Sequence, residues 1–398
     1  MTKQIQDAYI ISATRLPVGK RNGLYASTRP DDLLAAALRA VLSSVPALDA
    51  SRVDDVIVGC AMPEAEQGLN VARMAVLLAG LPNSIPGVTV NRFCASGLQA
   101  IADASARIRL GEADVMIAAG TESMSVMPQI MGNKIAFNPE IFTRDDTLGM
   151  AYGMGLTGEK VATQWNISRE DQDAFALASH RKACAAIETG HFNAEITPYN
   201  IVKHQQGENG HARLTATLAA RDEGPRPDTN AETLAALRPA FAAGGTVTAG
   251  NSSQMSDGAA ALLLVSERVV RELNIQPLAR VVSFAVAGVA PETMGIGPKV
   301  AIPRALKHAG LAQQALDWIE LNEAFAAQSI AVIRDLDLDP EKINPLGGAI
   351  ALGHPLGATG AIRTATLLHG LRRTRGKYGM VTMCIGTGMG AAGVFEAL

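Results

Sequence analysis

Cys94 is the residue whose setting in the sequence most suggests chemistry. It ends an apolar segment (88–94) with the length of a buried strand, and a run of small residues (95–97) then opens a helical segment. A thiol at the start of a helix meets unpaired N–H groups and the positive end of the helix dipole, and both favour the thiolate. The same N–H groups could hold an oxyanion. A buried, inert cysteine would show the same pattern, so this segment alone leaves a nucleophile and a structural residue equally open.

Two glycine-rich segments near the C-terminus favour the nucleophile. GGAIALGHPLGATGA (347–361) holds His354 at a strand-to-helix turn, where a histidine can act as the base for a thiol. MCIGTGMGAAG (383–393) places Cys384 at the end of an apolar strand, followed by Gly386, which suits a second thiol beside backbone donors. Three glycine-rich strand ends that carry Cys, His and Cys are hard to explain by core packing, and together they predict a catalytic site.

Strands and helices must bring these three strand ends together. Apolar runs of strand length alternate with Ala-rich helical segments along the chain. We expect strands at 8–13, 55–60, 88–94, 114–120, 279–288, 318–322 and 379–386. We expect helices at 31–43, 69–79, 96–110, 157–165, 169–189, 256–273, 300–309, 324–335 and 357–374. Because the strands are continuously apolar and helices follow them, the pattern predicts an α/β fold with sheets covered on both faces.

The two ends of the chain look like copies of one another. Cys94 and His354 each precede a glycine-bearing helix start, and strand-like segments that begin near residues 54 and 113 recur near 316 and 377. The landmarks keep their order at an offset of about 260 residues, which indicates a duplication rather than a short-period repeat. Chance matches between the strands of any α/β chain remain the alternative.

A stretch of different composition separates the two copies. Residues 121–247 combine Met-rich irregular sequence, a helical segment with Ser168 as its expected N-cap, and long polar runs. We interpret this stretch as an insertion that covers a site. The expected division is therefore 1–120 plus 248–275 for the first half, 121–247 for the insertion, and 276–398 for the second half.

Composition excludes several classes of function. The net charge is −3 and no Lys/Arg run occurs, which argues against nucleic-acid binding. The four cysteines form no CxxC pair, so neither a disulfide framework nor a structural metal site is expected, and free thiols indicate a reducing compartment. The N-terminus has no signal or transit pattern, and no apolar run approaches the ~20 residues of a membrane span. These features predict a cytoplasmic protein.

Five motifs closely resemble those of the thiolase family, in the family's order and spacing. They are VNRFCASGLQA, GNSSQMSDGAAA, NEAFAAQ, GGAIALGHPLGATGA and CIGTGMGAA, and they extend over nearly the whole chain. The resemblance implies the thiolase fold, with duplicated βαβαβαββ halves in a five-layered αβαβα arrangement and a loop domain inserted in the first half. One departure, GTGMG where GGGQG is common, leaves Gly386 in place.

The resemblance also implies a mechanism. Cys94 attacks the 3-keto carbon of a 3-oxoacyl-CoA while His354 takes the thiol proton. Cys384 protonates the departing acetyl-CoA carbanion or enolate, and a new CoA thiol removes the acyl group from Cys94. His354 and a water on Asn322 would hold the enolate oxygen, and the N–H groups of Cys94 and Gly386 would hold the other oxyanion. By its position alone, Asn322 could equally be the N-cap of the following helix.

Coenzyme A is expected as a substrate, with no tightly bound cofactor. The resemblance places Ser253 at the pantetheine, Met154 in the pocket, and Phe325 of NEAFAAQ among the CoA contacts. Arg226 is the candidate for the adenosine-phosphate end, where a guanidinium suits a phosphate or a purine face. A solvated surface charge is an equally good interpretation of Arg226.

Gly153 indicates the branch of the family. Biosynthetic thiolases typically carry a histidine there, in YHMG, whereas this chain reads YGMG, which should leave room for a longer acyl chain. We therefore favour a degradative 3-ketoacyl-CoA thiolase (acetyl-CoA C-acyltransferase). The alternatives are an acetoacetyl-CoA thiolase, a condensing enzyme of the ketoacyl-synthase type, and a silent CoA-binding subunit. A homodimer or homotetramer is expected, and a hydratase–dehydrogenase partner of fatty-acid β-oxidation stays open.

Overall fold

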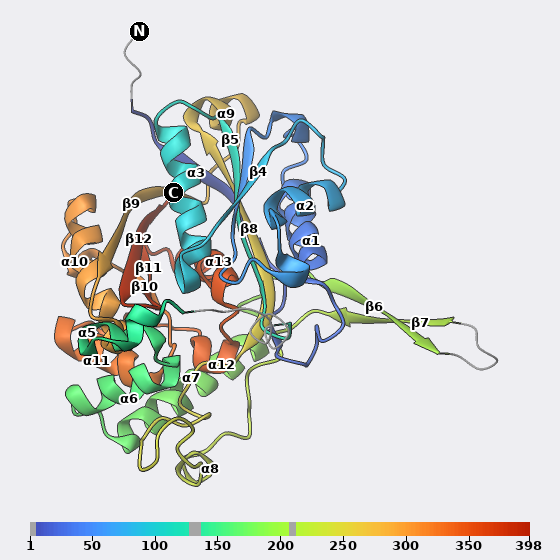
Figure 1. Cartoon of the computed structure of the whole chain (residues 1–398). Coiled ribbons are helices and arrows are strands. Elements are labelled where there is room, and N and C mark those ends of the chain that lie inside the picture. Colours follow the sequence, from blue (N-terminus) through green and yellow to red (C-terminus); the bar gives the residue numbers. More distant parts are fainter. Residues whose placement is uncertain (1–4, 127–136, 207–211) are drawn as a thin grey trace.

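The computed structural model describes residues 5–126, 137–206 and 212–398, and it is built on one mixed sheet of ten strands (Figure 1). The first half contributes β1 (Ala8–Arg15), β2 (Gly19–Lys20), β3 (Asp55–Gly59), β4 (Gly87–Val90), β5 (Val115–Ser123) and β8 (Ser256–Ser266). The second half contributes β9 (Ala279–Gly288), β10 (Trp318–Leu321), β11 (Tyr378–Ile385) and β12 (Met389–Ala397). The strand order is β10-β11-β12-β9-β1-β8-β5-β3-β4, with β2 paired to β8.

Strand pairing repeats between the halves, which confirms the predicted duplication. β3 and β5 are parallel, whereas β8 pairs antiparallel with both β5 and β1. In the second half β10 and β11 are parallel, and β12 pairs antiparallel with both β11 and β9. A single parallel bridge between Ile319 and Ile343 stands where the first half has β4. The two half-sheets are joined by two residue pairs of β1 and β9, Tyr9–Arg280 and Ile10–Ala279.

Helices form three layers around the two half-sheets. α3 (Ser96–Arg109) and α13 (Leu356–Thr374) lie between the half-sheets. α1 (Pro30–Ser43) and α2 (Val71–Leu78) cover the outer face of the first half, and α10 (Gly297–Ala309) covers that of the second (Figure 1). Three buried apolar clusters fill the interfaces between layers, and one of them surrounds α3 and α13 and includes residues of both half-sheets. The five-layered arrangement is therefore the one that was expected.

Glycines let the two central helices start against each other. A Cβ on Gly360 would lie 2.2 Å from the backbone nitrogen of Leu98, and one on Gly97 would lie 2.8 Å from the carbonyl oxygen of Gly357. No larger residue fits at such a backbone approach. The starts of α3 and α13, which carry the residues after Cys94 and His354, are thereby held at one place in the molecule.

The expected helix at 256–273 is wrong over most of its length. Residues Ser256–Ser266 form strand β8, every residue of which is buried, and only α9 (Glu267–Leu273) is helical. The sequence SDGAAALLLVS is rich in good helix formers. Because β8 lies between β1 and β5 and is covered on both faces, its continuous apolar run serves a central strand, and burial overrides helix propensity.

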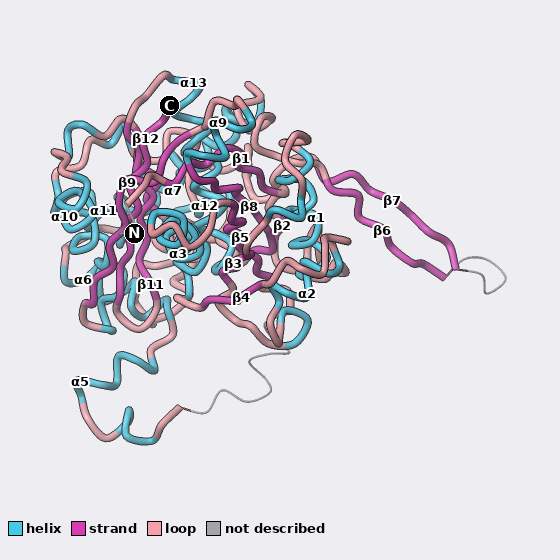
Figure 2. Tube along the Cα trace, turned by 90° about the horizontal axis from the view of Figure 1, so that it is seen from above, coloured by secondary structure: helices cyan, strands magenta, loops and turns pink. Residues whose placement is uncertain are grey.

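The insertion leaves the body after β5. Its described elements are α5 (Asp145–Leu148), α6 (Met154–Gln164), α7 (Arg169–Glu188), β6 (Tyr199–Gln206), β7 (Ala212–Ala219) and α8 (Ala231–Ala235). α6 and α7 pack on α11 (Ala326–Leu336), and α7 also contacts α12 (Ala349–Leu352), whereas the β6–β7 hairpin extends away from the body (Figure 2). Residues 127–136 and 207–211 of the expected insertion lie outside the described residues. Among the helices described, none combines the length and apolarity that crossing a membrane requires.

A buried ion network fastens the insertion to the first strand. The Arg15 guanidinium at the end of β1 donates to the carboxylates of Glu195 and Asp222, at 2.6 and 2.7 Å for the shortest contacts. All three side chains are almost fully buried. The Asp222 carboxylate also accepts the backbone N–H of Val18. These contacts fix the return path of the insertion, which leads directly to the segment with Arg226.

Candidate active site

Cys94 lies in a tight turn immediately before α3. A single 3₁₀ turn (Phe93–Ala95) joins β4 to the helix, and Phe93 has a φ of 45°, which is uncommon for a residue with a side chain. Local hydrogen bonds hold the turn, because the Asn91 Oδ1 accepts the N–H of Phe93 and the Ser96 hydroxyl donates to the carbonyl of Phe93. A strained turn fixed in this way is typical of functional positions.

The resting thiol of Cys94 differs from the expected thiolate. Burial raises the pKa of Cys94 to about 11, although hydrogen bonds from the backbone N–H groups of Gly386 and of Cys94 itself lower it. The expectation that the helix start would favour the thiolate is therefore wrong for the resting site, since desolvation outweighs the backbone donors. The thiol needs a base when it attacks. The two donors nevertheless converge on the sulfur, as an oxyanion site beside it requires.

His354 is a buried, neutral base. It follows α12 through Gly353, whose φ of 93° turns the chain. Burial lowers the pKa of His354 to about 3, and the Arg363 charge lowers it further. Its Nδ1 lies 2.7 Å from the Thr359 hydroxyl, and its Nε2 faces the Asn322 amide nitrogen at 3.3 Å. Because an amide nitrogen can only donate, Nε2 is the acceptor and Nδ1 carries the proton that Thr359 accepts.

Asn322 lies beside this imidazole and is not an N-cap. It follows β10, whereas α11 begins at Ala326 with Phe325 in the N-cap position, so the capping interpretation is wrong. The Asn322 Oδ1 is buried and has no hydrogen-bond partner among the residues described. A buried acceptor without a partner costs about 1–3 kcal/mol, so this atom is suited to a donor that water or substrate supplies.

Cys384 lies in a buried apolar cluster at the end of β11. Its side chain is fully buried and packs with Val247, Met294, Ala324 and Phe325. Burial raises its pKa well above the usual value, and the neighbouring Cys94 charge raises it further. The structure thus brings the two thiols within electrostatic reach of each other. The Gln328 side chain lies 3.2 Å from the Cys384 sulfur.

The structure adds Thr359 and Gln328 to the residues that the sequence singled out. Both lie inside motifs that had been recognised, GHPLGATGA and NEAFAAQ. Their polar side chains are almost fully buried in helices α13 and α11. Their places inside the two motifs, a few residues after His354 and Asn322, are the signal that could have identified them.

Three of the four expected CoA contacts lie close to these groups. The Met154 sulfur would be 3.8 Å from a Cβ on Gly386, and Met154 is exposed at the start of α6. Ser253 is partly exposed, and its N–H donates to the carbonyl of Ala324. Phe325 is buried in the same apolar cluster as Cys384 and packs edge-on against Phe241.

Arg226, the fourth expected CoA contact, lines a separate cavity. This cavity of about 170 Å³ is lined by residues that include Arg226, His180, Gln254 and Ile350. The Gln254 carbonyl at its edge accepts the backbone N–H of His354. Arg226 is exposed and its backbone N–H is held by the ring of His180. The lining of this cavity holds one cation, Arg226, and one carboxylate, Asp228, and Gln254 connects the cavity to the histidine turn.

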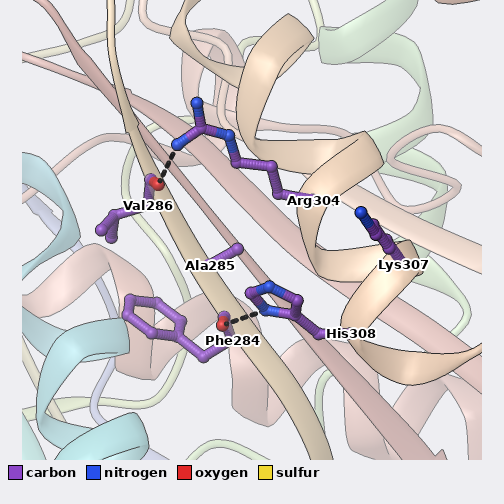
Figure 3. A pocket seen from close by; sticks show the side chains of 6 residues that line it. All are labelled: Phe284, Ala285, Val286, Arg304, Lys307 and His308. Carbon is purple, nitrogen blue, oxygen red and sulfur yellow. Dashed lines mark hydrogen bonds between the residues drawn. The ribbon is translucent and has the colours of Figure 1, made fainter.

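A larger cavity lies away from these groups, between β9 and α10. It measures about 530 Å³ and is lined by Phe284, Ala285, Val286, Arg304, Lys307 and His308 (Figure 3). Arg304 donates to the carbonyl of Val286, and the His308 ring hydrogen-bonds the carbonyl of Phe284. Beyond its two pairs with β1, this edge of β9 is thus covered by basic side chains, a common protection of edge strands.

Comparisons with known proteins agree with this geometry. Residues 8–268 match the family model for the thiolase N-terminal domain, and residues 275–397 match that for the thiolase C-terminal domain. The chain is 51% identical over 393 residues to a 3-ketoacyl-CoA thiolase of Bacillus subtilis (strain 168), a match that covers 98% of this chain and 100% of that protein. It is 46% identical to a beta-ketoadipyl-CoA thiolase of Pseudomonas aeruginosa, with 98% and 99% covered.

A solved structure gives the same answer for the fold. The acetyl-CoA acetyltransferase of Bacillus anthracis superimposes with a TM-score of 0.90 and 38% identity, over 100% of both chains. Sequence motifs, duplicated topology, paired thiols and these matches lead to one conclusion. The chain belongs to the thiolase family of acyltransferases.

Proposed function

We propose that the protein cleaves 3-oxoacyl-CoA with free CoA to acetyl-CoA and an acyl-CoA shortened by two carbons, with Cys94 as the acyl carrier. One observation carries the proposal: two backbone N–H groups converge on the Cys94 sulfur while the second thiol, Cys384, lies close enough for their charges to interact. A single nucleophile would not need the second thiol. A reaction that breaks a carbon–carbon bond needs both an acyl acceptor and a proton donor for the carbanion.

The first half-reaction transfers the acyl group. The Cys94 sulfur attacks the 3-keto carbon as Nε2 of the neutral His354 takes its proton. The oxygen of the tetrahedral intermediate is held by the N–H groups of Cys94 and Gly386. The bond between carbons 2 and 3 then breaks, leaving the acyl group on Cys94, and Cys384 donates its proton to carbon 2 to release acetyl-CoA.

The second half-reaction regenerates the thiol. His354 first returns to the Cys384 thiolate the proton that it took from Cys94. The sulfur of free CoA then attacks the acyl carbon as His354 takes its proton, and His354 passes this proton to the departing Cys94 sulfur. The unpaired Oδ1 of Asn322 supports a water beside His354 that contacts the enolate oxygen.

Coenzyme A binds under the insertion in this proposal. Arg226 meets the adenosine-phosphate end, and the pantetheine arm passes Ser253 and Met154 to the thiols. The cavity that joins Arg226 to the Gln254–His354 contact supports this path. Residues 121–247 then act as the CoA-covering domain between the two thiolase halves, 1–120 plus 248–275 and 276–398.

Gly153 supports an acyl chain longer than acetoacetyl. A Cβ at this position would meet no atom within 4 Å, so the N-terminus of α6 has open space beside Met154. The degradative 3-ketoacyl-CoA thiolase is therefore favoured over the acetoacetyl-CoA enzyme. Fatty-acid β-oxidation in the cytoplasm is the setting that we propose.

A homo-oligomer is proposed from the free edge of the first half. β4 ends the sheet, and Met74, Leu77, Leu78 and Val88 on α2 and β4 are exposed apolar side chains. A second copy paired along this edge would cover them.

Thiolysis kinetics test the proposed function. The rate constants kcat/KM are measured with free CoA for 3-oxoacyl-CoAs from C4 to C16 and for 3-oxoadipyl-CoA, with Cys94→Ala as the control. We expect activity beyond C4 that Cys94→Ala abolishes. A sharp preference for C4 would transfer the assignment to acetoacetyl-CoA thiolase, and near-normal turnover by Cys94→Ala would refute the mechanism.

A further inference from the structure

Gln328 contacts the second thiol from the first turn of α11. One terminal atom of its side-chain amide lies 3.2 Å from the Cys384 sulfur and 3.2 Å from the backbone carbonyl oxygen of Asn322. The other terminal atom lies 2.7 Å from the Ser329 backbone nitrogen and 2.9 Å from the Ser329 hydroxyl. Gln328 therefore connects Cys384, the proposed proton donor to carbon 2, with the turn that carries Asn322.

The neighbours decide which way the amide points. A backbone N–H can only donate, so the atom beside the Ser329 N–H is the amide oxygen. A carbonyl can only accept, so the atom beside the Asn322 carbonyl is the amide nitrogen. The nitrogen has two N–H groups. One reaches the Asn322 carbonyl, and the second is directed to the Cys384 sulfur.

Packing leaves the Gln328 side chain little freedom. It is fully buried, and a Cβ on Gly295 would lie 2.6 Å from the Gln328 Cβ, so only glycine fits on that side. Cys384 also packs in an apolar cluster with Val247, Met294, Ala324 and Phe325, and the Cys94 thiol lies within electrostatic reach. Glu323 is the carboxylate nearest to Gln328 along the chain, but its side chain accepts hydrogen bonds from Ser179 and Asn344. Gln328 is thus the polar side chain built against this sulfur.

We propose that Gln328 is a positioning residue for Cys384: its amide N–H donates to the sulfur, stabilises the thiolate, and directs the S–H of the thiol form toward the substrate. The direction follows because the amide nitrogen cannot accept the S–H proton. The thiolate is stabilised because a hydrogen bond to the charged form of a group favours that form. Burial and Cys94 both oppose a charge on Cys384, and the hydrogen bond from the Cys384 backbone N–H favours it. In this proposal Gln328 adds a second donor to that one.

The proposed role of Gln328 rests on the proposed function. Two partial reactions, measured separately, distinguish a failure of one from a failure of the other. Acylation of Cys94 by acetyl-CoA, followed by rapid quench and mass spectrometry, does not use Cys384. Exchange of the acetyl-CoA methyl protons with D₂O depends on Cys384, which removes a proton as the thiolate and returns a deuteron. Both rates are measured from pH 6 to 9 for the intact protein and for Gln328→Met, Gln328→Glu and Ser329→Ala.

Gln328→Met removes the donor at similar volume. We expect exchange at pH 7 to fall about 10–100-fold, the effect of one to two pKa units, with acylation nearly unchanged. Gln328→Glu adds a pH signature: its protonated carboxyl can donate, but its carboxylate cannot, so its exchange rate relative to the parent should fall as pH rises. Ser329→Ala keeps the Ser329 N–H on the amide oxygen and should resemble the parent.

Each outcome has one meaning. Equal losses of acylation and exchange in Gln328→Met, or a pH-independent ratio in Gln328→Glu, would reduce Gln328 to a packing residue and overturn the proposal. Failure of the parent protein to acylate Cys94 would refute the proposed function, and the role of Gln328 that rests on it would be refuted as well.

Discussion

Replacement of Thr359 by valine tests how His354 is held. Valine keeps the shape of threonine and removes the hydroxyl that lies 2.7 Å from Nδ1 of His354. His354 is 4% exposed and Thr359 is 1% exposed, so water cannot easily take the place of the hydroxyl. An unpaired buried N–H costs about 1–3 kcal/mol. Since about 1.4 kcal/mol corresponds to tenfold in rate, loss of this contact in the transition state lowers kcat about 5–100-fold.

Steady-state thiolysis with saturating CoA measures the effect, and thermal unfolding reports the fold. Thr364→Val is the matched control, because Thr364 is a buried threonine of the same helix whose hydroxyl donates only to the carbonyl of Gly360. We expect kcat to fall in Thr359→Val with KM little changed, and to stay near parental in Thr364→Val. Parental kcat in a folded Thr359→Val protein would refute the idea that this hydrogen bond orients the imidazole.

Three further predictions follow from single contacts. Gly153→His fills the open space at the start of α6, so kcat/KM should fall for C8 and longer 3-oxoacyl-CoAs while C4 is spared; an equal loss at all lengths would contradict the acyl-pocket assignment. Asp222→Asn weakens the buried network around Arg15 and should lower the free energy of unfolding in urea by about 3–5 kcal/mol, whereas a loss near zero would show that the network is dispensable. Burial lowers the pKa of His180 to about 4, so between pH 6.5 and 4 the unfolded chain binds more protons there and stability is lost as pH falls; His180→Asn should therefore flatten this acid dependence, and an unchanged slope would contradict it.

The residues that we propose for the chemistry could be chosen from the sequence because they stand in long, specific motifs. Cys94, His354 and Cys384 each end or follow an apolar run, and glycines mark the close approaches at 97, 357 and 360. The duplicated topology was also readable, since the halves repeat their landmarks at one offset. These features are local in sequence or periodic along it.

Features that depend on neighbours distant in the sequence were missed. β8 was taken for a helix because Ala and Leu do not reveal that β1 and β5 lie on either side. The pKa of Cys94 was misjudged because burial is set by the packed site, whereas the helix start is visible in the sequence. Gln328 was overlooked because its partner Cys384 is 56 residues away.

Trapping the covalent intermediate tests the central claim most directly. The protein is mixed with a 3-oxoacyl-CoA in the absence of free CoA, quenched in acid, digested, and mapped by mass spectrometry. The mechanism predicts stoichiometric release of acetyl-CoA and a shortened acyl group on the peptide that contains Cys94, removed on addition of CoA. An acyl group on Cys60, Cys184 or Cys384 instead, or acetyl-CoA release with no acylated cysteine, would contradict it.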